Sequence, residues 1–211
     1  MIPERTVPGA ESRHAVTAPR FPPGILLCIV TASPAGTGVG LSSCEVLMQV
    51  VYARQDHANA ARPALFLAGP TPRSPEVPSW RPDALRLLDE LLFPGTVFIP
   101  EAAGTGGLST SYEDQVRWEW ACLERADAIA FWVPRELKTL PGFITNIEFG
   151  LYCRSGKVLL GYPSGAPKMR YLHLLAGAWN IPVFHDLSDL LRSAVARLCE
   201  AGRTDFRESV P

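Results

Sequence analysis

Short apolar segments alternate with amphipathic ones from Val46 onward, and this alternation constrains the fold more than any other feature. Runs rich in β-branched and apolar residues, ended by proline, glycine or charged residues, are typical of buried strands. The predicted strands are Val46–Ala53, Ala64–Ala68, Thr96–Ile99, Ala128–Val133, Val158–Gly161 and Pro182–Phe184. The helices predicted between or after them are Pro82–Leu92, Tyr112–Arg125, Ile147–Arg154 and Leu187–Glu200.

Strands that alternate with helices in units of about 30 residues favour right-handed βαβ crossovers and a parallel sheet. The sequence therefore predicts an α/β fold, with a single doubly wound, flavodoxin-like parallel sheet of about five strands and helices on both faces. The predicted domain covers residues 46–201, and residues 202–211 form a C-terminal tail.

Residues 1–45 have a different composition, dominated by Pro, Gly, Ser and Thr, and predict a flexible or poorly structured N-terminal extension. Within it, Gly36–Gly40 resembles a phosphate-binding loop but lacks the Lys-Ser/Thr pair of a P-loop. We interpret that stretch as linker. Met48 is an alternative native start of the domain.

Composition excludes several classes of function. The formal net charge of −1 argues against a broad surface for nucleic acid or anionic membranes. No apolar run approaches the roughly 20 residues of a membrane span, and no signal peptide is predicted. The five cysteines and four histidines are scattered, so the sequence predicts no metal site and no cofactor, and a reducing, cytoplasmic compartment.

Ligands of parallel sheets bind beyond the carboxyl ends of the strands. That rule selects three loops, Gly69–Trp80, Glu101–Ser111 and Pro134–Asn146. Asn146 at the end of the third is a good helix N-cap, which would place Glu148 in the first turn of the next helix. The helix dipole there favours an ionised carboxylate, suited to attack a sugar carbon. A carboxylate that merely stabilises the start of the helix explains the same position.

Five short motifs follow one another along the chain: Phe66–Arg73 (FLAGPTPR), Gln115–Glu119 (QVRWE), Ala126-Asp127, Pro141–Gly150 (PGFITNIEFG) and Ser155–Lys157 (SGK). By the order and spacing of these motifs, the stretch from about Ala64 to Leu198, about two-thirds of the chain, resembles the nucleoside 2-deoxyribosyltransferase superfamily, especially its divergent bacterial branch. The resemblance implies a small-molecule nucleoside or nucleotide substrate and a homo-oligomer.

The resemblance also implies roles for single residues. Glu148 corresponds to the nucleophile. Glu119, eight residues before Asp127, corresponds to the proton-handling acid, although relatives carry Asp there; alternatively it only pairs with Arg117 or Arg125. The remaining expected substrate contacts are Gly69, Thr71 and Arg73 on the first loop, Thr145 and Asn146, which could equally cap the helix, and Asp127, which could instead shape the start of its strand.

The implied reaction is cleavage or exchange of an N-glycosidic bond through a covalent glycosyl-Glu intermediate, by a transferase or a hydrolase. The alternatives are a catalytically silent nucleotide-derivative binding or sensor module, and a subunit whose site another chain completes. Gly142 stands where nucleotide N-glycosidases of the superfamily carry a phosphate-binding serine, which puts a 5′-phosphate in question. Aromatic candidates for stacking on a base are Phe131, Trp132 and Phe143, whereas Trp118 and Trp120 are candidates for the core.

Overall fold

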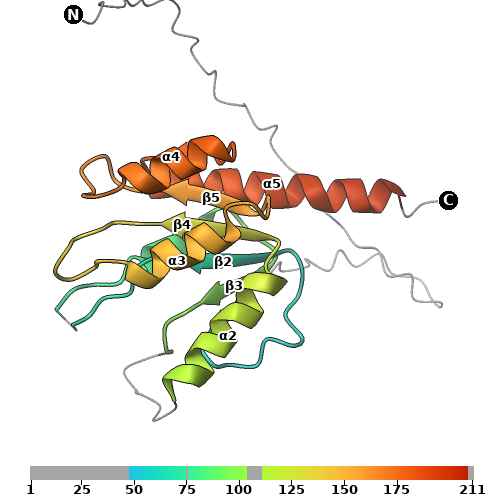
Figure 1. Cartoon of the computed structure of the whole chain (residues 1–211). Coiled ribbons are helices and arrows are strands. Elements are labelled where there is room, and N and C mark those ends of the chain that lie inside the picture. Colours follow the sequence, from blue (N-terminus) through green and yellow to red (C-terminus); the bar gives the residue numbers. More distant parts are fainter. Residues whose placement is uncertain (1–47, 75, 104–110, 209–211) are drawn as a thin grey trace, which may run out of the picture. The chain divides into compact units, whose positions relative to one another are not determined.

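The structure is a computed structural model that describes residues 48–74, 76–103 and 111–208 (Figure 1). The predicted N-terminal extension and its stretch Gly36–Gly40 lie outside these ranges. Within the described ranges six strands form one parallel sheet: β1 Gln49–Tyr52, β2 Ala64–Ala68, β3 Thr96–Ile99, β4 Ala128–Trp132, β5 Val158–Gly161 and β6 Val183–Phe184. Five helices accompany it: α1 Arg81–Glu90, α2 Tyr112–Arg125, α3 Phe143–Tyr152, α4 Arg170–Ala178 and α5 Leu187–Glu208.

The strand order is β1-β3-β2-β4-β5-β6. Five of these strands, in the order β3-β2-β4-β5-β6, follow the doubly wound, flavodoxin-like pattern, and β1 adds an edge strand beside β3. The predicted α/β fold with a parallel sheet and helices on both faces is confirmed, with one strand more than the expected five.

Each buried strand is apolar on both sides and separates two cores. Alternate residues of β2 and β4, such as Phe66 and Phe131, pack with α2, α3 and α4, whereas their neighbours Leu67 and Ala130 pack with α1 and α5. Helices therefore cover both faces, three on one and two on the other. This arrangement explains why the strands read as continuous apolar runs.

The connection from β2 to β3 runs toward one edge of the sheet, and the connection from β4 to β5 runs toward the opposite edge. The connections that follow β2 and β4, which are neighbouring strands, therefore lead to helices on opposite faces of the sheet: α1 on one and α3 on the other. Such a switch point leaves a crevice at the carboxyl edge of the two strands, where ligands of these folds bind. The loops that follow β2 and β4 are in contact, since the Arg73 amide donates a hydrogen bond to the Thr139 carbonyl at 3.4 Å.

The predicted first and last residues of several elements are confirmed, including those of β2, β3, β5 and α2. The helix start predicted at Ile147 is wrong, because α3 begins four residues earlier. Gly142 is its N-cap, in a left-handed conformation (φ 64°) that glycine adopts without strain. Helix α4 was missed, although Leu172 and Ala176 are spaced to face the core, and α5 continues beyond Glu200 to Glu208.

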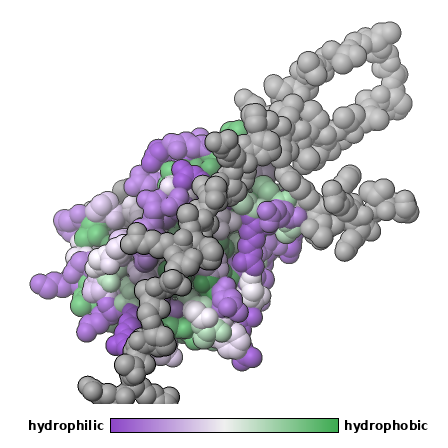
Figure 2. All heavy atoms as spheres, turned by 90° about the horizontal axis from the view of Figure 1, so that it is seen from above, coloured by the Kyte–Doolittle hydropathy of each residue, from purple (hydrophilic) through white to green (hydrophobic). Residues whose placement is uncertain are grey.

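No helix in the described part of the chain is long and apolar enough to cross a membrane. The face of the domain seen in Figure 2 mixes hydrophilic and apolar residues.

Candidate functional site

Glu148 lies in the second turn of α3, as the sixth residue of the helix, and its side chain is half-buried. Its pKa is raised to about 8, first by burial and then by the charge of Glu119, while the charge of Arg81 opposes the rise. The prediction that a helix start keeps this carboxylate ionised is therefore wrong. The dipole acts over the first turn, and Glu148 lies beyond it, near the carboxylate of Glu119.

Glu119 reaches the same region from α2 and is also half-buried. Burial raises its pKa, while a hydrogen bond donated by Gln115 Nε2 to its Oε1 (2.7 Å) and the charge of Arg81 lower it. The two arginines considered as partners lie elsewhere: Arg117 is 4.0 Å from Asp114, and Arg125 donates to the Ala60 carbonyl at 2.9 Å. The structure thus brings Glu119 and Glu148 into electrostatic contact from different helices.

Arg81, which the sequence analysis did not select, is the buried cation beside these carboxylates, with 1% of its surface exposed. Its guanidinium donates to the carbonyl oxygens of Leu67 (3.2 Å) and Gly69 (2.9 Å) and to the hydroxyl of Thr71 (3.3 Å). It also forms an ion pair with Glu101 Oε1 at 2.5 Å. A cation in the first turn of a helix interacts unfavourably with the helix dipole. The position of Arg81 at the start of α1 is therefore the sequence signal that could have marked it as a site residue.

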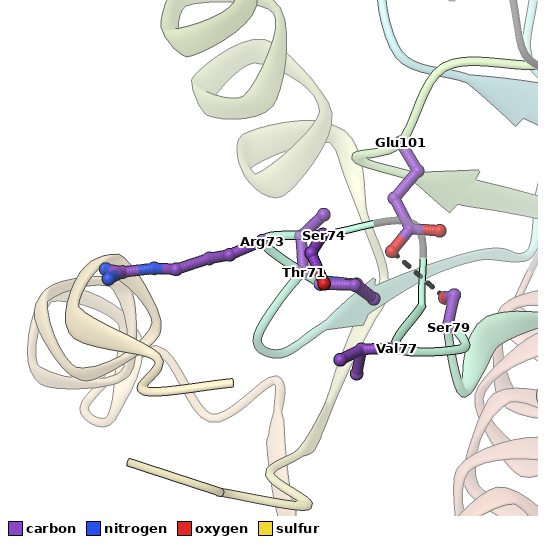
Figure 3. A pocket seen from close by; sticks show the side chains of 7 residues that line it. Thr71, Arg73, Ser74, Val77, Ser79 and Glu101 are labelled. Carbon is purple, nitrogen blue, oxygen red and sulfur yellow. Dashed lines mark hydrogen bonds between the residues drawn. The ribbon is translucent and has the colours of Figure 1, made fainter. Parts of the chain in front are cut away.

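Glu101 follows β3 and links this cation to an open hollow of about 420 Å³ (Figure 3). Its carboxylate accepts a second hydrogen bond from the hydroxyl of Ser79 at 3.0 Å. The hollow is lined by Thr71, Pro72, Arg73, Ser74, Val77, Ser79 and Glu101. Glu119 and Glu148 are not among its lining residues, so Arg81 is the group that connects the hollow with the carboxylate pair.

The three residues predicted on the first loop have different surroundings. Gly69 has a φ of 154°, and a Cβ on it would lie 2.1 Å from the Trp132 carbonyl oxygen, so a side chain does not fit. Thr71 is exposed and accepts the hydrogen bond from Arg81. Arg73 points away from the other lining residues in Figure 3 and lies over the ring of Phe143, 5.4 Å from its centroid.

Thr145 and Asn146 lie in the first turn of α3, and neither caps it through its side chain. The prediction of Asn146 as N-cap is wrong: its side-chain oxygen accepts a hydrogen bond from the buried Arg135, which also donates to the Lys168 carbonyl at 3.1 Å. Thr145 is 3% exposed, with its hydroxyl oxygen 3.5 Å from where a Cβ on Gly142 would lie. Asn146 therefore ties the start of the helix that carries Glu148 to Arg135.

Comparison with known families gives one match. Residues 62–166 match the family described as "Nucleoside 2-deoxyribosyltransferase like". The chain is thus similar to this family over about half of its length. The matched segment begins just before β2 and contains Arg81, Glu101, Glu119 and Glu148. No curated protein matches the chain.

Within this nucleoside 2-deoxyribosyltransferase-like domain, Asp127 lies apart from the other predicted site residues. It precedes β4 at the amino edge of the sheet, accepts a hydrogen bond from the Ala64 amide at 2.8 Å and pairs with Arg62. The carboxyl edge that holds the crevice is the opposite one. Asp127 therefore shapes the start of the strands, and we assign it no contact with substrate.

The aromatic candidates of the nucleoside 2-deoxyribosyltransferase-like domain divide by burial. Phe131 and Trp132 are core residues of β4, so the expectation that they stack on a base is wrong. Trp118 is core, as considered, but Trp120 is 56% exposed. Phe143, at 65% exposed, is the aromatic ring available beside the crevice.

Proposed function

We propose that the domain cleaves or exchanges the N-glycosidic bond of a nucleoside or nucleotide, with Glu148 as nucleophile and Glu119 as proton-handling acid. The observation that carries the proposal is that these two half-buried carboxylates, from α3 and α2, interact with each other and with the buried Arg81. The similarity of residues 62–166 to the nucleoside 2-deoxyribosyltransferase-like family supports a nucleoside-type ligand.

The proposed reaction is a double displacement. A carboxylate oxygen of Glu148 bonds to C1′ while the C1′–N bond breaks, and Glu119 gives its proton to the departing base. The product is a glycosyl ester on Glu148. Water or a second base then attacks C1′, Glu119 accepts the proton of that nucleophile, and the ester bond breaks to restore Glu148. Two inversions at C1′ retain the configuration of the sugar.

The raised pKa of Glu148 has a consequence for this reaction. With a pKa of about 8, only about one molecule in ten carries an ionised Glu148 at pH 7. The nucleophilic form is thus a minority form of the free protein. Positive charge developing on the sugar in the transition state favours that form, so the reaction proceeds through it.

The same observation favours the second candidate, a catalytically silent binding module. A protonated carboxyl donates a hydrogen bond rather than attacking carbon, and would hold a ligand without turnover. Glu119, whose pKa burial also raises, would then be a second hydrogen-bonding group.

We also propose that the domain forms a homo-oligomer. Ile144, Ile147 and Leu151 recur along α3 with 49%, 58% and 66% of their surfaces exposed. Helical spacing of three and four residues places them along one side of the helix that carries Glu148. An exposed apolar side of this kind is typical of a contact between subunits. Light scattering on the wild type and on Ile147→Asp tests this, and a monomeric wild type would contradict it.

A panel assay tests the enzymatic proposal. Purified protein is incubated with ribo- and 2′-deoxyribonucleosides and their 5′-monophosphates, each with and without a second free base, and products are separated by chromatography. Glu148→Gln keeps the shape and removes the nucleophile, and Glu113→Gln in the exposed first turn of α2 is the matched control. Base release or exchange that is lost only in Glu148→Gln supports the proposal. Ligand binding without turnover in the wild type supports the binding module.

A further inference from the structure

Arg81 is held in place from several sides, and its position next to the carboxylate pair is therefore fixed. Two backbone carbonyls of the β2 end, the Thr71 hydroxyl and the Glu101 carboxylate accept its hydrogen bonds. The Trp80 ring covers the guanidinium at 4.7 Å. A buried side chain with these partners does not swing into solvent, so its charge acts continuously on its surroundings.

Three carboxylates surround the cation of Arg81. Glu101, Glu119 and Glu148 all interact electrostatically with Arg81. If all three were ionised, one positive charge would face three negative ones in a region largely removed from water, which is costly. Glu101 is the carboxylate in direct contact with Arg81 and takes up most of its charge. Glu119 and Glu148 are left with little compensation, so the two together retain a proton.

We propose that Arg81 and Glu101 are positioning residues that set how many protons the Glu119–Glu148 pair holds at neutral pH. The place of that proton determines which carboxylate is ionised and can attack the sugar and which is protonated and can donate to the base. Only this catalytic consequence rests on the proposed function; the coupling between the four groups does not.

The other titratable groups facing the pair stay neutral. Tyr152 on α3 faces Glu148, and burial raises its pKa to about 12. Cys122 on α2 faces Glu119, and burial likewise raises its pKa to about 12. Neither adds charge near pH 7. Arg81 and Glu101 are therefore the charged groups, besides the pair itself, through which the described residues control this proton.

Carboxyl ¹³C NMR titration of the whole chain tests the proposal without any substrate. The signals are assigned with Glu119→Gln and Glu148→Gln. Glu101→Gln removes one negative charge and leaves Arg81 uncompensated, so the apparent pKa values of the pair are expected to fall by about one to two units. Arg81→Met should raise them, and Arg81→Lys should bring them back toward those of the wild type.

The matched control is Glu90→Gln, which removes the acidic partner of Arg86 on the exposed side of α1 and should shift neither signal. Unchanged pKa values of the pair in Glu101→Gln would overturn the proposal, even if Arg81→Met does not fold. The acid limb of the pH profile of kcat/KM should move to lower pH in Glu101→Gln. A shifted NMR titration with an unmoved profile overturns the catalytic consequence. If the wild type turns over no nucleoside while Glu101→Gln still shifts the pKa values of the pair, only the proposed function is overturned.

Discussion

Replacing Glu148 by Gln should stabilise the domain, and the gain should grow with pH. The substitution keeps the shape of the side chain and removes its titration. A carboxyl whose pKa is about 8 in the folded chain and about 4.5 in the unfolded chain keeps its proton only when folded. Its contribution to stability is complete below pH 4.5 and is lost as the pH rises toward 8.

The size of the effect follows from the two pKa values. Each pH unit between them lowers the free energy of unfolding by about 1.4 kcal/mol. Between pH 5 and pH 8 the wild type should therefore lose about 3 kcal/mol relative to Glu148→Gln, allowing for the part of the side chain that keeps contact with water. The glutamine amide does not titrate, so the pH dependence of the difference in unfolding free energy between the two proteins reports the titration of Glu148.

Urea unfolding of both proteins at pH 5, 6, 7 and 8 measures this difference. Glu113→Gln, in the exposed first turn of α2, is the matched control and should differ from the wild type by a constant amount over this range. A gap between wild type and Glu148→Gln that stays constant from pH 5 to pH 8 would refute the reasoning. It would mean that Glu148 is ionised in the folded protein, as a carboxylate stabilised by the helix start would be.

Three further outcomes are expected. Glu119→Gln should lower kcat by about 10²- to 10⁴-fold for natural bases and much less for a base that leaves without protonation, since the acid is then dispensable; equal losses on both substrates would argue against that role. Gly69→Ala should lower the melting temperature, with a cost of about 1–3 kcal/mol or more, because its Cβ would meet the Trp132 carbonyl oxygen at 2.1 Å; an unchanged melting temperature would contradict this packing. Asp127→Asn should cost about 1 kcal/mol through its contacts with Ala64 and Arg62, while kcat/KM per folded molecule stays unchanged; a specific loss of turnover would restore Asp127 to the site.

The sheet could be predicted because its strands are short, apolar on both faces and separated by clear turn residues. β2 and β3 begin and end where the pattern changes. The start of α3 could not be predicted in the same way. Asn146 has the composition of an N-cap, but tertiary contact with Arg135 occupies its side chain, and the left-handed conformation of Gly142 begins the helix earlier. The earlier start moves Glu148 out of the first turn, and burial together with the charge of Glu119 raises its pKa.

The candidate site could be predicted in part from motifs, and its electrostatics could not. Glu119 and Glu148 are 29 positions apart, and nothing in their spacing shows that they share an environment. Arg81 and Glu101 lie on further segments, and their pairing depends on how α1 and the end of β3 meet at the sheet edge. Arg73, the arginine that the first-loop motif contains, stacks on Phe143 instead.

Trapping the glycosyl ester on Glu148 tests the central proposal most directly. The protein is mixed with each nucleoside of the panel, quenched in acid within the first turnovers, digested and analysed by mass spectrometry. The proposal predicts one peptide heavier by the mass of the sugar residue, with the added mass on Glu148, and no such peptide from Glu148→Gln. Turnover accompanied by an adduct on another residue, or by inversion at C1′ without any adduct, would contradict it.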